Sequence, residues 1–442
     1  MGGAGGHASQ YGYRDVCLDL DEPLGKCVPR RTAFAGAALL GGLLATLGSA
    51  RGAPDAQHFT QIERGRYLTV ASDCAACHND PDGDTPFSGG RPIPTPFGAI
   101  LAPNITPDPD TGIGNLSEAQ FDAVLREGKL SDGKREYPAM PYPYYAKLSR
   151  EDVLAIRTYL NTVPPVRHAV VTNNLRFPFN MRSLMGFWNA FYFTAGEFQP
   201  DSSHSSAWNR GAYLVEGPGH CGACHTPKTL LGGDRPQLEL QGLALQGWFA
   251  PNITNDERSG LGRWSLGDIV DYLKRGHNRF AAASGPMAEE VAHSSSRMTN
   301  VDLMAIAGYL KAKPGQSDDH QPLAPTDPHM AAGAAIYGDL CSACHKADGL
   351  GVPYLFPNIA TSASVASREP TTLIRVILEG AQSVATDEEP TSPAMPAFGW
   401  QLTDGQVAAV STYIRNSWGH AASVVTERNV RSAREALGAD NR

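Results

Sequence analysis

A pentapeptide, Cys-x-x-Cys-His, occurs three times in this chain and constrains its fold more than any other feature. The copies are Cys74–His78, Cys221–His225 and Cys341–His345. Their surroundings repeat as well: Arg64-Gly65 recurs 146 residues later as Arg210-Gly211, and Pro103-Asn104 recurs 148 residues later as Pro251-Asn252. Self-similarity at a fixed period indicates duplicated structural units. We therefore expect three tandem domains, the third shorter than the first two.

Each repeat is predicted to end in a helix, because apolar residues recur at helical spacing. These stretches cover residues 151–160, 300–310 and 403–414, after the predicted N-caps Ser149, Thr299 and Thr403. The predicted domains span 60–165, 206–315 and 328–420, with linkers at 166–205 and 316–327 and a polar tail at 421–442. Plentiful glycine (46) and proline (33) favour short helices joined by many turns.

The histidine that follows each cysteine pair selects between the chemistries open to such pairs. Cys-x-x-Cys-His is the attachment signature of c-type haem, in which both thiols form thioether bonds and the histidine ligates the iron. Zinc would need four ligands at each site, and no second cysteine pair lies nearby. A disulfide within each pair would not need the histidine. We predict three covalently bound haem c groups, attached at Cys74, Cys77, Cys221, Cys224, Cys341 and Cys344, with His78, His225 and His345 as iron ligands.

The sixth iron ligand separates electron transfer from catalysis. A methionine thioether fills this position and raises the reduction potential, whereas an open position would admit peroxide, nitrite or oxygen. Met140 and Met395 share the setting Pro-Ala-Met-Pro and are the predicted ligands of the first and third haems. For the second haem we favour Met287, since it lies 62 residues after His225, as Met140 does after His78. Met298 is the alternative, and ordinary core packing remains an interpretation for any single methionine.

The N-terminal region resembles an export signal. Arg30 and Arg31 precede an apolar run over 33–47, and small residues follow at 48–50. This pattern predicts a secretory signal, or a retained anchor, over 31–52. Residues 1–30 are then an N-terminal extension or the result of a misassigned start, and no role is assigned to Cys17 or Cys27. We expect a periplasmic protein associated with the cytoplasmic membrane.

Taken together, these motifs resemble the tri-haem cytochrome c subunits of bacterial membrane-bound periplasmic dehydrogenases. The resemblance runs from about Gln61 to about His420 and rests on Arg-Gly-x-Tyr-Leu, Pro-Asn-Ile-Thr, Tyr-Pro-Ala-Met-Pro-Tyr, Gly-Leu-Gly-Arg-Trp-Ser and Ala-Met-Pro-Ala-Phe. It implies a mainly α fold with three class I cytochrome c domains in a row. It also implies a flavin, PQQ or molybdenum dehydrogenase subunit as electron donor, and ubiquinone or another respiratory acceptor. The tail from Thr426 is highly charged where relatives carry an amphipathic helix, so attachment through the partner or the N-terminal segment is favoured.

The resemblance also suggests which groups orient the axial histidines. In class I cytochromes c a proline carbonyl accepts a hydrogen bond from the ring of the iron-ligating histidine. Pro357 lies 12 residues after His345, which suits this role. Pro103 and Pro251 lie 25 and 26 residues after their histidines, so an intervening loop is required there. A simple turn at these prolines is the alternative.

Two rival functions remain open at this point. One is a free periplasmic shuttle or an oxidase-associated cytochrome, and the other, less favoured, is a haem peroxidase or reductase. The net charge of −8 argues against nucleic acid as a partner. The aromatic linker 182–200, with Phe187, Trp188, Phe191, Tyr192 and Phe193, either packs against the neighbouring domains or contacts a partner subunit or membrane.

Overall fold

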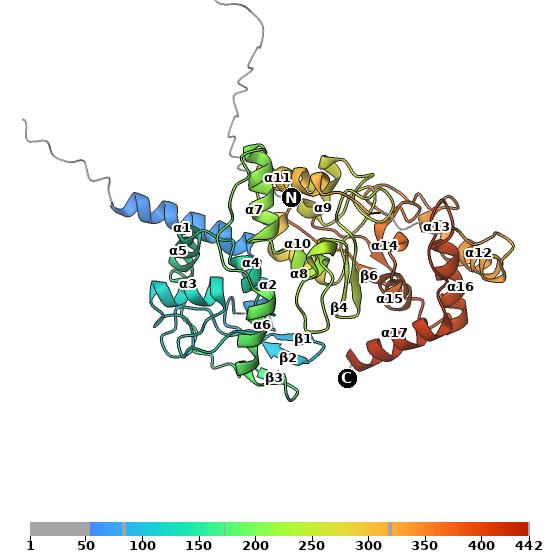
Figure 1. Ribbon diagram of the computed structural model, residues 1–442. Helices are drawn as coiled ribbons and strands as arrows, with labels where there is room; N and C mark the ends of the chain where they lie inside the picture. Colours follow the sequence, from blue (N-terminus) through green and yellow to red (C-terminus); the bar gives the residue numbers. More distant parts are fainter. Residues whose placement is uncertain (1–53, 82–84, 172, 317–320, 441–442) are drawn as a thin grey trace, which may run out of the picture. The chain divides into compact units, whose positions relative to one another are not determined.

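Two helices cross at a glycine in each repeat. The computed structural model describes residues 54–81, 85–171, 173–316 and 321–440 (Figure 1). The crossing pairs are α1 (Pro54–Ala71) with α5 (Arg150–Leu160), α7 (Ser206–Glu216) with α11 (Asn300–Ala312), and α12 (Pro328–Leu340) with α16 (Asp404–Ile414). A Cβ on Gly65, Gly211 or Gly333 would lie 1.9, 2.0 or 2.3 Å from the carbonyl oxygen of Ala155, Ala305 or Ala409. The glycine of Arg-Gly-x-Tyr-Leu is therefore required by the close approach of two backbones.

Shorter helices complete each repeat. They are α2 (Cys74–His78), α3 (Glu118–Glu127) and α4 (Tyr142–Tyr145) in the first repeat; α8 (Gly222–His225), α9 (Leu266–Arg275) and α10 (Pro286–His293) in the second; and α13 (Ser342–His345), α14 (Ala363–Ala366) and α15 (Thr371–Glu379) in the third. Helices α6 (Met185–Tyr192) and α17 (Glu427–Asp440) lie outside these sets, and single 3-10 turns occur at Arg182–Leu184, Pro236–Leu238 and Ser295–Arg297.

The strands are few and short. In the described residues β1 (Pro92–Thr95), β2 (Gly98–Leu101) and β3 (Asn173–Leu175) form an antiparallel sheet in that order, with Ile93 opposite Ile100 and Ala99 opposite Asn174. Two hairpins complete the set: β4 (Leu243–Leu245) with β5 (Trp248–Ala250), and β6 (Ala381–Gln382) with β7 (Ala394–Met395). The prediction of a mainly α fold is confirmed.

The helices that close each repeat begin where the sequence predicts. Ser149, Thr299 and Thr403 accept hydrogen bonds from the backbone N–H of Asp152, Asp302 and Gln406 at 3.1, 3.2 and 3.3 Å. Such caps satisfy one of the N–H groups that a helix start leaves without an intrahelical partner. The predicted N-caps are thereby confirmed.

Each repeat contributes its own cluster of buried apolar side chains. The first is centred on Leu148, Val153 and Ile156, the second on Leu214, Leu303 and Tyr309, and the third on Tyr337, Ile374 and Val407. The second cluster also contains Ala71, which comes from the first repeat. The first two cores therefore touch one another.

The third core extends into the segment predicted to be a polar tail. Helix α17 packs on α15 and α16, and it buries Val430 and Leu437. Val425, which precedes it, is buried as well. The last described helix is thus part of the third hydrophobic core, although its outer face is highly charged.

The predicted N-terminal features, 1–30 and 31–52 with Cys17 and Cys27, lie outside the described residues. The described residues between Pro54 and Asp440 form one compact unit. Within the described ranges, no helix combines the length and the apolar character needed to cross a bilayer.

Some aromatic side chains of the linker 182–200 pack against other parts of the protein, and others are exposed. Trp188 is buried and donates from Nε1 to the carbonyl oxygen of Leu231 at 2.9 Å, and Phe193 packs edge-on against Tyr142. Phe187 and Phe191, one helical turn apart on α6, are 70% and 80% exposed. Packing against the neighbouring domains is thus correct for Trp188, while contact with a partner or membrane stays a prediction for the two phenylalanines.

Candidate haem-binding sites

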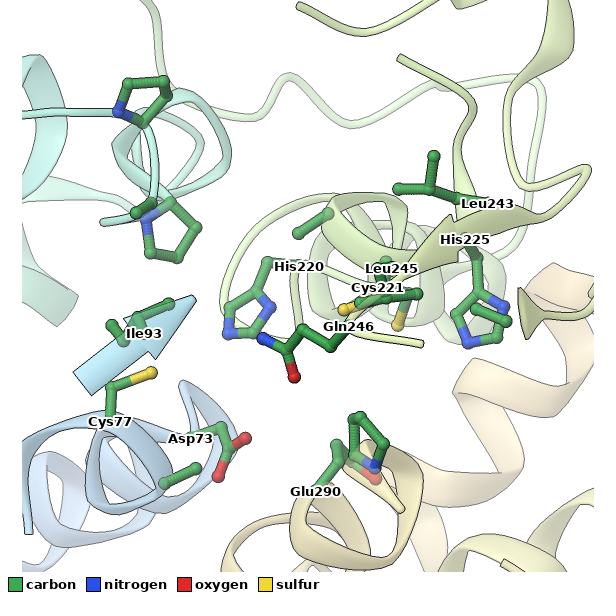
Figure 2. A pocket seen from close by; sticks show the side chains of 18 of the residues that line it. Asp73, Cys77, Ile93, His220, Cys221, His225, Leu243, Leu245, Gln246 and Glu290 are labelled. Carbon is green, nitrogen blue, oxygen red and sulfur yellow. The ribbon is translucent and has the colours of Figure 1, made fainter. Parts of the chain in front are cut away.

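The first two pentapeptides open into one shared, mainly apolar cavity of about 1610 Å³. Figure 2 shows Cys77 from the first and Cys221 and His225 from the second around this space. The cavity is also lined by the other residues predicted to bind the first two haems, namely Cys74, His78, Met140, Cys224 and Met287. Residues separated by a whole repeat in the sequence are therefore brought to a single site.

The chain enters these two pentapeptides through a strained turn. Asp73 and His220, each directly before the first cysteine, have φ of 49° and 34°, in the left-handed region that side-chain-bearing residues rarely adopt. The third pentapeptide is entered differently, because α12 runs up to Leu340 and Cys341 has φ of −113°. The close likeness of the first two repeats thus extends to backbone geometry.

A proline carbonyl lies beside the ring of each pentapeptide histidine. Nδ1 of His78, His225 and His345 lies 2.7, 2.7 and 3.0 Å from the carbonyl oxygen of Pro103, Pro251 and Pro357. With Nδ1 as the donor, each ring has its Nε2 free of a proton and able to ligate a metal. Burial lowers the pKa of all three imidazoles, which favours the neutral form that ligates.

The intervening loops required by the longer spacings are present. The β1–β2 hairpin lies between His78 and Pro103, and the β4–β5 hairpin lies between His225 and Pro251. The third repeat, whose spacing is 12 residues, closes the same hydrogen bond with a short bridge between Val352 and Phe356. The hydrogen bonds expected of the three prolines are thereby confirmed.

The cysteine thiols are suited to covalent attachment rather than to a zinc site. Burial raises the pKa of the Cys74, Cys77 and Cys221 thiols to about 12, and that of Cys341 to about 11. Burial therefore favours the protonated form of these thiols when neither a metal nor a haem is bound. Across the described ranges, no three His, Cys, Asp or Glu side chains gather as a metal site. Paired thiols, an oriented imidazole and a large apolar cavity therefore fit a haem.

Two of the candidate sixth ligands, Met140 and Met287, sit in rigid local structure beside this cavity. Met140 lies in a turn in which its N–H donates to Tyr137 at 3.0 Å and its carbonyl accepts from the N–H of Tyr142 at 2.8 Å. Met287 lies in the first turn of α10, after Pro286. Met298 lines the cavity too, although its side chain is only 4% exposed and belongs to the second core. The structure therefore brings both Met287 and Met298 to the cavity.

The third site lies outside the shared cavity. Cys344 is exposed, and neither His345 nor Met395 lines the space that serves the first two sites. Met395 is held in β7, where it pairs with Ala381, and packs against the third core. The third repeat nevertheless reaches the cavity wall through residues such as Ala363 and Thr372.

The shared cavity also contains ionisable residues that were not predicted from the sequence, among them Asp73, His220 and Glu290. Figure 2 shows Asp73, His220 and Glu290 around it. Burial raises the pKa of Glu290 to about 7, although Ser295 donates a hydrogen bond to its carboxylate at 2.9 Å, and burial lowers the pKa of His220 to about 4. The only sequence signal was position, since Asp73 and His220 directly precede equivalent cysteines.

Comparison with known proteins places the chain in a family. The family model described as "Cytochrome c" matches residues 62–164 and 330–418. The gluconate 2-dehydrogenase cytochrome c subunit of Pantoea cypripedii is 40% identical over 415 residues, which cover 89% of this chain and 94% of that protein. The chain belongs to the cytochrome c family. As a cytochrome c it is expected to carry covalently bound haem c, since that is the cofactor of the family.

Two further cytochrome subunits are similar to this chain over most of its length. The fructose dehydrogenase cytochrome subunit of Gluconobacter japonicus is 37% identical, with 86% of this cytochrome and 84% of the relative covered. The cytochrome c subunit of the quinone alcohol dehydrogenase of Gluconobacter oxydans is 38% identical, with 86% and 83% covered. The resemblance to dehydrogenase cytochrome c subunits, first seen in short motifs, is therefore confirmed over most of the chain.

Proposed function

We propose that this cytochrome is the tri-haem electron-transfer subunit of a periplasmic dehydrogenase complex. The observation that carries the proposal is the shared cavity, in which two pentapeptides with oriented histidines and candidate methionine ligands face one space. Haems attached at two pentapeptides that line the same cavity would lie near one another, as electron transfer within one chain requires. The third pentapeptide, with its own oriented histidine, provides a further site.

The chain's residues hold and tune the cofactors. Haem c supplies one-electron redox chemistry when bound. In each repeat the two cysteines would anchor the haem, the histidine would hold it through Nε2, and Met140, Met287 or Met395 would be its second iron ligand. The proline carbonyls hold each imidazole in one orientation, and the mainly apolar lining of the shared cavity surrounds the first two sites. Both features would influence the potential of a bound haem.

The methionines favour electron transfer over catalysis by this subunit. A closed sixth position leaves no place for peroxide or nitrite to bind the iron. A haem peroxidase or reductase would require one repeat without such a ligand, yet each repeat has a candidate methionine. We expect this subunit to carry out no substrate chemistry of its own.

The donor is proposed to be the catalytic subunit of a sugar, polyol or alcohol dehydrogenase, most simply a flavin enzyme. This rests on relatives that are named as cytochrome subunits of gluconate, fructose and alcohol dehydrogenases. A PQQ or molybdenum enzyme is the alternative donor. Ubiquinone or another respiratory acceptor at the periplasmic face of the cytoplasmic membrane would receive the electrons.

The test is optical and uses native membranes. Gluconate, other sugars, polyols, alcohols and aldehydes are added one at a time while the absorption band of reduced c-type haem is recorded, with a strain lacking this gene as control. Reduction by one substrate only in the presence of the gene supports the proposal and identifies the dehydrogenase. A fully haem-loaded protein that no substrate reduces would instead favour a free shuttle or an oxidase-associated cytochrome.

A further inference from the structure

Two tyrosines join the first two repeats by reciprocal hydrogen bonds. Tyr67, on α1 of the first repeat, donates to Oδ2 of Asp302, on α11 of the second, at 2.5 Å. Tyr213, on α7 of the second repeat, donates to Asp152, on α5 of the first. Tyr67 and Tyr213 occupy equivalent positions, each two residues after the crossing glycine, and Asp152 and Asp302 are equivalent too. The contact is therefore made twice, once in each direction.

Each aspartate is also held by an arginine of its own repeat. Nε of Arg64 donates to Asp152 at 2.7 Å, and Nε and Nη2 of Arg210 donate to Asp302, both at 2.8 Å. Both aspartates are buried, and a buried carboxylate is stable only when it is paired and hydrogen-bonded. The arginine fixes each carboxylate within its repeat, so the tyrosine of the other repeat meets an acceptor that is already in place.

The third repeat lacks every member of this arrangement. Aligned on its crossing glycine, Gly333, it has Ala332 where the arginines stand and Ala335 where the tyrosines stand. Gln406 replaces the aspartate and instead completes a capping box with Thr403. The reciprocal contact thus joins only the two repeats whose pentapeptides share a cavity.

The tyrosines are close in sequence to the walls of that cavity. Helix α1 continues from Tyr67 to Ala71, which lines the cavity, and Cys74 follows. On α7 the residue after Tyr213 is Leu214, which lines the same cavity. A change in the angle between α1 and α7 would therefore move the two pentapeptides relative to one another.

We propose that Tyr67 and Tyr213 are positioning residues that fix the spacing between the first two haem sites. The inference rests on the proposed electron-transfer function, because the rate of transfer between fixed cofactors falls steeply as their separation grows. Other contacts, such as the ion pair of Arg91 with Glu289 at 2.7 Å, also join the repeats. Loss of the tyrosine hydroxyls is thus expected to loosen this junction without separating the domains.

The test compares Tyr67→Phe, Tyr213→Phe and the double variant in the full-length, haem-loaded protein without a dehydrogenase. The matched control is Tyr337→Phe, because the Tyr337 hydroxyl donates to the backbone carbonyl oxygen of Lys346 within the third repeat, at 2.6 Å. Amide hydrogen exchange is followed in α1 and α11, and the magnetic interaction between the first two ferric irons is measured by pulsed electron paramagnetic resonance.

In the double variant, exchange near Tyr67 and Asp302 is expected to rise about 10- to 100-fold, since a hydrogen bond to a charged group contributes about that factor. The distribution of distances between the first two irons should broaden, with haem content unchanged, while Tyr337→Phe alters neither readout. Exchange and distances equal to those of the wild type would overturn the proposal. If the double variant does not fold, the same comparison applies to Tyr67→Phe alone. Both readouts need no dehydrogenase, so they stand even if no substrate reduces the protein in membranes.

Discussion

Asp302 accepts a hydrogen bond from Tyr67, which lies 235 residues earlier in the chain, at 2.5 Å. Arg210 holds the same carboxylate from within its own repeat. Asp302 thus takes part in a helix cap through its backbone N–H. Through its carboxylate it takes part in an ion pair and in the junction between two repeats.

This relationship predicts a loss of stability in acid. Burial acts to raise the pKa of Asp302, but hydrogen bonds from Arg210 and Tyr67 outweigh it and hold the pKa below its ordinary value of 3.8. A lowered folded-state pKa means that the carboxylate contributes stability above about pH 4 and loses it as the pH falls below 3.8. We expect Asp302→Asn to increase hydrogen exchange in α11 most strongly at pH 7, and the increase should shrink progressively as the pH falls below 3.8. An effect that does not change with pH would contradict the assignment.

Two conservative variants decide whether Met287 or Met298 is the sixth iron ligand of the second haem. Met287→Leu is expected to lower one of three reduction potentials and to let carbon monoxide bind one ferrous haem, because the thioether is lost. Met298→Leu, a volume-conserving change in the core, should leave all three potentials in place at a cost below about 1.5 kcal/mol. Redox titration with optical detection measures both. The reverse pattern would assign Met298 as the ligand.

Replacement by alanine is predicted to have opposite effects on stability at two glycines of the second repeat, one at the helix crossing and one away from it. Gly211→Ala places a Cβ 2.0 Å from the carbonyl oxygen of Ala305 and should destabilise the protein by about 1–3 kcal/mol, as overpacking does. Gly308→Ala, in α11, meets nothing within 4 Å and should stabilise it by about 0.5–1 kcal/mol. Thermal unfolding of the haem-loaded protein tests both. A neutral Gly211→Ala variant would show that the two helices can move apart freely.

Helix α17 is predicted to contribute to the stability of the third repeat. Val430 is fully buried, so Val430→Ala should cost about 1–3 kcal/mol through lost contacts and a residual cavity. Ser432→Ala, on the exposed face of the same helix, should stay within about 0.5 kcal/mol of the wild type. Denaturant unfolding followed at the haem absorption compares them. Equal stability of the two variants would mean that α17 is not part of the third core.

Much of the site could be predicted from the sequence, because its parts depend on short spacings. The pentapeptide places two thiols and an imidazole within five residues, and the caps at Ser149, Thr299 and Thr403 are local too. The 12-residue spacing of His345 and Pro357 pointed to their hydrogen bond directly. For Pro103 and Pro251 the sequence required an intervening loop but did not specify the hairpins that form it.

Only the tertiary structure decided how the repeats combine. The shared cavity and the reciprocal Tyr67–Asp302 and Tyr213–Asp152 contacts join residues that are distant in sequence. Val430 packs into the third core although it lies in a segment rich in charged residues. Periodicity within one segment reports which face is apolar, but it carries no information about which other segment covers that face. The amino-acid sequence therefore determined the repeat unit and the candidate ligands, while packing between repeats determined that two of the candidate sites line one cavity and the third lies outside it.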